Sequence, residues 1–91
     1  ENIDPMNRWL FALAGYNAGG ARISRYREKA AADGLDPDRW FGEVEKVAAD
    51  RIGSETVNYV RYVMKYYLAY RMTFEREELR RDVLARLTRA D

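Results

Sequence analysis

The stretch WLFALAGYNAGG, at residues 9–20, joins a helical apolar pattern to an abrupt glycine stop. In and just before it, apolar residues recur every three or four positions, which is the spacing of one face of an α-helix. These residues are Met6, Trp9, Leu10, Leu13 and Ala14. Asp4-Pro5 is typical of an N-cap followed by the first helical residue, and Gly19-Gly20 is typical of a helix end. The pattern predicts a helix over residues 5–16, with Phe11 off the main face.

A second helix is predicted outward from this stretch, over residues 21–32. Ile23, Tyr26, Arg27 and Ala30 share one of its faces by helical spacing, and Gly34 is expected to end it.

Asp36-Pro37 repeats the pattern of Asp4-Pro5 and therefore predicts the start of a third helical segment. Gly42 is expected to split this segment into a short turn and a longer helix, which Gly53 closes. Ser54 then makes a good N-cap for a fourth helix.

Neither glycine nor proline occurs between residues 55 and 91, so the fourth helix has no internal stop signal. It carries two apolar stripes, and a helix of this kind is buried or forms an interface. One stripe is Val57, Val60, Met64, Tyr67 and Leu68, and the other is Tyr59, Tyr62, Tyr66 and Tyr70. Residues 73–91 hold five acidic residues and five arginines around a narrow apolar stripe. This tail is expected to pack on a neighbour, to continue the fourth helix, or to fray.

These patterns predict an all-α fold of four or five helices, because no segment alternates with the period of a β-strand. A chain of 91 residues is one small domain or a part of one. We assign residues 1–72 to the domain part and residues 73–91 to a charged amphipathic helical tail.

The composition excludes several classes of function. The absence of Cys and His rules out disulfides, thiolate zinc sites, catalytic triads and imidazole bases. We expect no cofactor and no metal site, although a site for a hard metal ion made of carboxylates alone is compatible with the composition. A net charge of +1 gives no electrostatic argument for nucleic acid. No apolar run approaches the ~18 residues of a membrane span, and the first four residues do not resemble a signal peptide.

Two polar strings contain residues suited to chemistry. In residues 15–20, Asn17 offers a donor and an acceptor that suit an amide such as an N-acetyl group, and Tyr16 offers an aromatic face and a hydroxyl. The alternative is a plain helix end that Asn17 caps. In residues 54–61, Glu55 and Tyr59 lie on one helix face, so the hydroxyl could orient the carboxylate or tune its pKa. The alternative is an acid at the helix N-terminus beside a packed tyrosine.

Two further features have a functional and a structural interpretation. The tyrosine run over residues 59–70 could stack sugars or bases, or it could pack a buried helix. Arg22, Arg25 and Arg27 could meet anionic groups, or they could form a solvated face.

Taken together and in order, the two polar strings resemble a known family. Residues 11–19, FALAGYNAG, followed by Arg22-Ile23, resemble the AYNAG motif of lytic transglycosylases with a soluble-lytic-transglycosylase domain. Residues 55–67 resemble the ETxxYV…YY motif found later in that domain. The connecting residues 34–45 look like the branch related to membrane-bound lytic transglycosylase F. The resemblance covers about residues 5–70.

This resemblance implies a lysozyme-like α-domain that acts on peptidoglycan in the bacterial cell envelope, in the periplasm. Enzymes of the family cleave the β-1,4 bond between N-acetylmuramic acid (MurNAc) and N-acetylglucosamine (GlcNAc) without water. One Glu acts as general acid on the glycosidic oxygen, and a raised pKa suits that role. It then acts as base, and the muramoyl 6-hydroxyl closes on C1 to leave a 1,6-anhydro-MurNAc end.

The family's functional positions carry over to the two strings. The implied substrate-binding residues are Tyr16, Asn17, Ala18, Gly19 and Glu55. Glu55 is expected to support the sugar cleft rather than to act as the general acid. Tyr59 matches the tyrosine whose hydroxyl points at the catalytic Glu, and it is the catalytic position assigned in this chain.

The sequence also departs from the family's pattern. The catalytic Glu of the family belongs to a Glu-Ser motif followed by a Gly-Leu-Met-Gln segment, and neither is present here. The resemblance therefore implies the C-terminal half of a catalytic domain, with the catalytic Glu upstream and no turnover by these residues alone. Gly15 stands where Ala is more usual, and Tyr62 where Asn is frequent.

The expected partners follow from the same resemblance. They are peptidoglycan glycan strands and either the other half of the domain or a self-associating copy. Contact with a membrane is expected only through parts outside this chain. Two other functions stay open, namely a non-catalytic peptidoglycan-binding module and a helical protein-interaction module. Nucleic-acid binding is not expected, because no basic stripe is evident.

Overall fold

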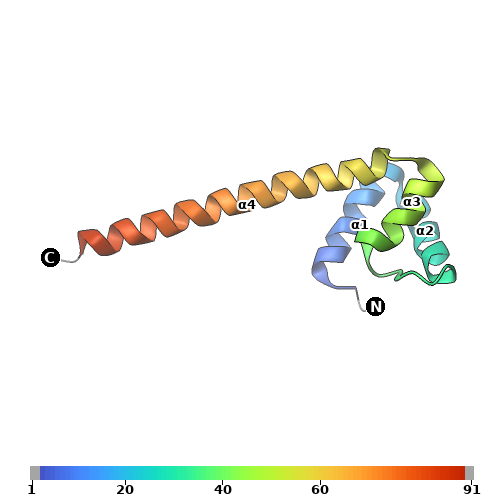
Figure 1. Cartoon of the computed structure of the whole chain (residues 1–91), viewed down its shortest axis with the longest axis horizontal. Helices are drawn as coiled ribbons and strands as arrows, with labels where there is room; N and C mark the ends of the chain where they lie inside the picture. Colours follow the sequence, from blue (N-terminus) through green and yellow to red (C-terminus); the bar gives the residue numbers. More distant parts are fainter. Residues whose placement is uncertain (1–2, 90–91) are drawn as a thin grey trace. The chain divides into compact units, whose positions relative to one another are not determined.

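The computed structural model describes residues 3–89, and most of them are helical. The α-helices are α1 (Pro5–Ala18), α2 (Gly20–Ala32), α3 (Glu45–Ile52) and α4 (Glu55–Thr88). A short π-type turn, η1 (Trp40–Val44), precedes α3 (Figure 1). No strand occurs between residues 3 and 89, so the predicted all-α fold class is confirmed.

The chain divides after Arg61 into two compact units. The first contains α1, α2, η1, α3 and the start of α4, and the second contains the rest of α4. The sequence-based boundary between residues 72 and 73 stays a prediction. Its outer limits, residues 1–2 and 90–91, lie outside the described residues.

Helix α1 begins as predicted, with Asp4 as its N-cap. One carboxylate oxygen of Asp4 accepts the backbone N–H of Asn7 at 2.8 Å, and the other accepts the Asn7 side-chain amide at 2.9 Å. These hydrogen bonds hold the pKa of Asp4 below its ordinary value. The helix runs two residues past its predicted end because the left-handed turn comes at Gly19, with φ 98°. Leu10 and Ala14 are buried as expected, whereas Met6 is 42% exposed.

Helix α2 begins immediately after this turn, one residue earlier than predicted. Its predicted apolar face is confirmed, because Ile23, Tyr26 and Ala30 are buried. Helix α2 packs against both α1 and α3, and Figure 1 shows these three helices grouped together. The core is made of buried residues from these helices, from η1 and from the start of α4.

The prediction of a helix start at Asp36-Pro37 is wrong. The Asp36 carboxylate accepts the backbone N–H of Asp38 at 2.9 Å, two residues on, which makes an Asx turn instead of an N-cap. The turn η1 begins at Trp40 instead, and its backbone is non-helical at Phe41 and Gly42. Gly42 breaks it as predicted, with φ 74°, and α3 follows from Glu45.

Trp40 is the largest fully buried side chain of the core. Its ring and that of Phe11 make a T-shaped contact, with a centroid distance of 6.2 Å and an interplanar angle of 89°. Its backbone N–H donates to the side-chain oxygen of Asn7 at 2.9 Å. Asn7 therefore connects the start of α1 to η1, and Phe11, which lies off the main face of α1, packs against Trp40.

Helix α4 begins at Glu55, directly after Ser54, as predicted. It continues without interruption to Thr88, so the charged tail is a continuation of the fourth helix. Thr56, Val57 and Val60 are buried in the first unit. The tyrosine stripe is not buried within the second unit, where Tyr62, Tyr66 and Tyr70 are exposed. Its use as an interface stays a prediction.

Candidate functional site

The two motif strings meet in the first unit, at the end of α1 and the start of α4. Tyr16 in the last turn of α1 stacks on Tyr59 of α4, with ring centroids 6.5 Å apart and an interplanar angle of 26°. Tyr16 is 85% exposed and Tyr59 is half-buried. The pair therefore presents a broad aromatic surface at a junction of two helices.

A hydrogen bond lies next to this aromatic pair. The Thr56 hydroxyl donates to Oδ1 of Asn17 at 2.7 Å, and Thr56 is only 2% exposed. Asn17 thus lies inside α1 and reaches across to α4, so the alternative in which it caps the helix end is wrong. No role for Thr56 was predicted from the sequence. Its place in the ETxxYV string, directly after Glu55, was the available signal.

A small cavity of about 120 Å³ opens beside this hydrogen bond. Its lining consists of Asn17, Ala18, Arg22, Ile52, Glu55 and Thr56. Three predicted substrate-binding residues therefore share one cavity with a buried hydroxyl. Glu55 lies in the first turn of α4, where the positive end of the helix dipole favours a carboxylate.

Gly19 lies at the turn from α1 to α2, beside the cavity-lining Ala18. A Cβ added at this position would meet no atom within 4 Å. The requirement for glycine is therefore conformational, since φ 98° is a region that other residues rarely adopt.

Glu45 is a buried acidic residue at the start of α3 to which the sequence alone gave no role. It is the one buried acidic residue between residues 3 and 89, with 6% exposure. One carboxylate oxygen accepts the backbone N–H of Gly42 at 3.2 Å, and the other accepts Nε of Arg61 at 3.0 Å. The bond to Glu45 raises the pKa of Arg61 further above its usual range. Both Glu45 oxygens are thus engaged in holding η1 and α4 together, which gives this residue a structural role.

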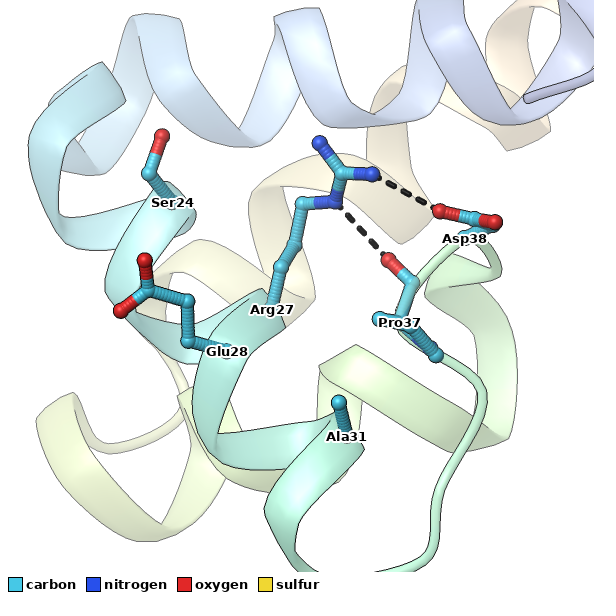
Figure 2. Close-up of a pocket in the computed structure, with 6 residues that line it drawn as sticks. All are labelled: Ser24, Arg27, Glu28, Ala31, Pro37 and Asp38. Atoms are coloured by element: carbon cyan, nitrogen blue, oxygen red, sulfur yellow. Dashed lines mark hydrogen bonds and ion pairs between the residues drawn. The ribbon is translucent and has the colours of Figure 1, made fainter. Parts of the chain in front are cut away.

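A larger cavity of about 330 Å³ lies elsewhere, between α2 and the turn after it (Figure 2). Arg27 crosses it and donates from Nε to the Pro37 carbonyl and from an Nη to Asp38, both at 2.8 Å. Its guanidinium also lies 4.9 Å from the centre of the Phe11 ring. The solvated-face interpretation is therefore wrong for Arg27, which fastens the turn to α2. No predicted site residue lines this cavity.

Two kinds of feature are absent from the part of the chain that the structure describes. Its acidic residues form no group of three or more that could hold a metal ion. None of its helices combines the length and apolar character needed to cross a bilayer.

Comparisons with known proteins identify similar sequences. The chain is 35% identical to membrane-bound lytic murein transglycosylase F of Ectopseudomonas mendocina, over 74% of this chain and 16% of that protein. The proteins of the same name from Stutzerimonas stutzeri and Pseudomonas fluorescens are 32% and 33% identical over the same shares. The chain therefore spans about 16% of the length of the curated relatives it matches.

Two other comparisons found no match. No protein-family model matches the chain, and no solved structure matches it. The resemblance that the motifs indicated is confirmed by the curated relatives: this chain is similar to one segment of the membrane-bound lytic murein transglycosylases F.

Proposed function

We propose that this chain forms one wall of the glycan-binding cleft of a peptidoglycan lytic transglycosylase. The observation that carries the proposal is the meeting of the two motif strings, through the Tyr16–Tyr59 stack and the Thr56–Asn17 hydrogen bond. An aromatic face offers an apolar surface on which a sugar ring can stack, and an amide side chain offers the donor and acceptor that an N-acetyl group can bind. The similarity to membrane-bound lytic murein transglycosylases F supports the same substrate class.

The proposed reaction cleaves the MurNAc–GlcNAc β-1,4 bond without water and leaves 1,6-anhydro-MurNAc ends. A Glu that this sequence does not contain acts as acid on the glycosidic oxygen and then as base toward the muramoyl 6-hydroxyl. Tyr59 orients that Glu through its hydroxyl, and Glu55 supports the cleft. The substrate-binding residues are Tyr16, Asn17, Ala18, Gly19 and Glu55. A location in the bacterial cell envelope, in the periplasm, belongs to the same proposal.

The test uses the protein in which this segment occurs, incubated with purified peptidoglycan. Mass spectrometry of the released muropeptides distinguishes the reaction, because anhydro products are lighter by one water than hydrolysis products. Tyr59→Phe removes the hydroxyl and retains the ring, so it should lower the rate while leaving peptidoglycan binding close to that of the wild type. Hydrolysed products, or an unchanged rate with Tyr59→Phe, would overturn the proposal.

The 91 residues alone are proposed to bind glycan without turnover, because the Glu-Ser motif of the family is absent from them. Release of anhydro-muropeptides by this chain alone would contradict this part of the proposal. Matched incubations with the chain and with buffer, analysed in the same way, provide the measurement.

A helical interaction module is the second candidate, and the exposed row on α4 favours it. Tyr62, Tyr66, Tyr70 and Phe74 are all more than half exposed, and an apolar row of this size marks a surface that another protein segment covers. Either another part of the catalytic domain or a second copy of the chain would cover the row. Sedimentation velocity over a range of concentrations tests association of copies. A chain that stays monomeric and melts cooperatively would count against an uncovered interface.

A further inference from the structure

We propose that Thr56 is a positioning residue that sets the Asn17 side-chain amide to read the acetamido group of an N-acetylated sugar. The inference deepens the proposed function and rests on it, since it concerns the ligand of the same cleft. The starting point is the 2.7 Å hydrogen bond in which the Thr56 hydroxyl donates to Oδ1 of Asn17.

The bond determines which end of the Asn17 amide is available to a ligand. An amide offers an oxygen acceptor at one end and an NH₂ donor at the other. Thr56 occupies the oxygen, so the NH₂ group is left as the donor. Among residues 3–89, the Nδ2 group of Asn17 has no hydrogen-bond partner. A ligand group that accepts a hydrogen bond, such as an acetamido carbonyl, complements it.

Thr56 is well suited to holding the amide in place. It is 2% exposed, so its hydroxyl bonds Asn17 in a setting with little contact with bulk water. Its β-branched side chain is restricted in χ1 by the helix, which limits the directions that the hydroxyl can take. Without this bond, the Asn17 amide would be free to turn over and present its oxygen instead.

The cavity beside the bond has the size and charge of a site for a small neutral group. Its volume of about 120 Å³ is enough for several water molecules, and therefore for an acetamido group but not a whole sugar ring. Arg22 and Glu55 line it together, so its positive and negative charges offset each other. A neutral amide carbonyl fits this environment.

Side-chain amide signals of the ¹⁵N-labelled 91-residue chain provide the test. The probes are chitotetraose, which is fully N-acetylated, and the tetramer of glucosamine, which lacks the acetyl groups. We expect chitotetraose to shift the Asn17 Nδ2 signals and to bind more tightly than the deacetylated tetramer. Thr56→Val, which retains the shape of the side chain and removes the hydroxyl, should weaken chitotetraose binding about three- to tenfold. It should also abolish the preference for the acetylated sugar.

Matched variants separate positioning from general damage. Thr56→Ser keeps the hydroxyl and should retain the preference for the acetylated tetramer. Asn17→Asp still accepts the Thr56 hydrogen bond but cannot donate, so it should lose the preference without losing the contact between α1 and α4. Thr73→Val removes a hydroxyl that bonds only the Ala69 carbonyl on α4, and it should behave as the wild type does. Circular dichroism of each variant checks the fold, and Asn17→Asp decides the outcome if Thr56→Val does not fold.

The outcomes separate failure of this inference from failure of the proposed function. Equal binding of both tetramers by the wild type would overturn the acetamido role and leave the glycan cleft intact. An unchanged preference in Thr56→Val or in Asn17→Asp would overturn the positioning role alone. Binding of neither tetramer by the folded wild-type chain would overturn both this inference and glycan binding by these residues.

Discussion

Tyr16 and Tyr59 stack with their ring centroids 6.5 Å apart, although one belongs to the end of α1 and the other to the beginning of α4. Next to them, Asn17 and Thr56 are joined by a hydrogen bond. Residues that resemble two separate family motifs thus meet in the first unit.

Replacing Tyr59 separates the role of its ring from that of its hydroxyl. Tyr59→Ala removes the stack on Tyr16 and should lower the free energy of unfolding by about 2 kcal/mol. Tyr59→Phe keeps the ring and should change the free energy of unfolding by less than about 0.5 kcal/mol. Urea unfolding followed by circular dichroism measures both. Equal losses in the two variants would mean that the hydroxyl, and not the stack, joins the helices.

Gly19 and Gly20 are adjacent but should respond oppositely to alanine. Gly19 has φ 98°, so Gly19→Ala should destabilise the first unit by about 1–3 kcal/mol. Gly20 begins α2 without a positive φ, and an added Cβ meets nothing within 4 Å. Gly20→Ala should therefore stabilise by about 0.5 kcal/mol, through a smaller loss of chain entropy on folding. Thermal melts of the two variants measure both changes in stability. A stability change of the same sign in both variants would contradict the assigned turn.

Trp40 should tolerate phenylalanine much better than alanine. The side chain is fully buried, so Trp40→Ala should cost about 3–5 kcal/mol and leave the first unit largely unfolded. The buried Nε1–H of Trp40 has no hydrogen-bond partner in the described part of the chain. Trp40→Phe therefore removes an unsatisfied donor along with some volume, and it should cost about 1–2 kcal/mol. A Phe variant as damaged as the Ala variant would show that the indole N–H is satisfied in solution.

The N-cap of α1 should make stability depend on pH. The pKa of Asp4 is lowered in the folded chain, first by its hydrogen bond to the Asn7 backbone. Its contribution is therefore fully present above the ordinary Asp pKa of about 3.9, and it is lost as the pH falls from there through the folded pKa. Asp4→Asn caps without titrating but lacks the negative charge that the helix N-terminus favours, so it should be less stable than the wild type at pH 6.

The same comparison at low pH provides the control. Once Asp4 is protonated, the stability advantage of the wild type over Asp4→Asn should disappear. Melting temperatures of both proteins between pH 6 and pH 2.5 test this. A difference that does not change over this range would contradict the assigned cap.

Local patterns in the sequence were sufficient for most of the helices. Asp4 and Pro5 correctly predicted the start of α1, and Gly42 correctly predicted the break before α3, because caps and left-handed turns depend on neighbouring residues alone. The same reasoning failed at Asp36, which has the same local pattern as Asp4. There the carboxylate turns to Asp38, and Arg27 of α2 holds the Pro37 carbonyl, a contact that local sequence does not specify.

For the candidate site, too, some features could be predicted from the sequence and others could not. The sequence by itself determined which residues belong to the two motif strings, since residue types and their spacing are properties of the chain. Only the tertiary structure decided that Asn17 meets Thr56, that Tyr16 meets Tyr59 and that Glu45 is buried against Arg61. These contacts join residues far apart in the chain, and they exist only because burial of Trp40, Val57 and Val60 brings the helices of the first unit together.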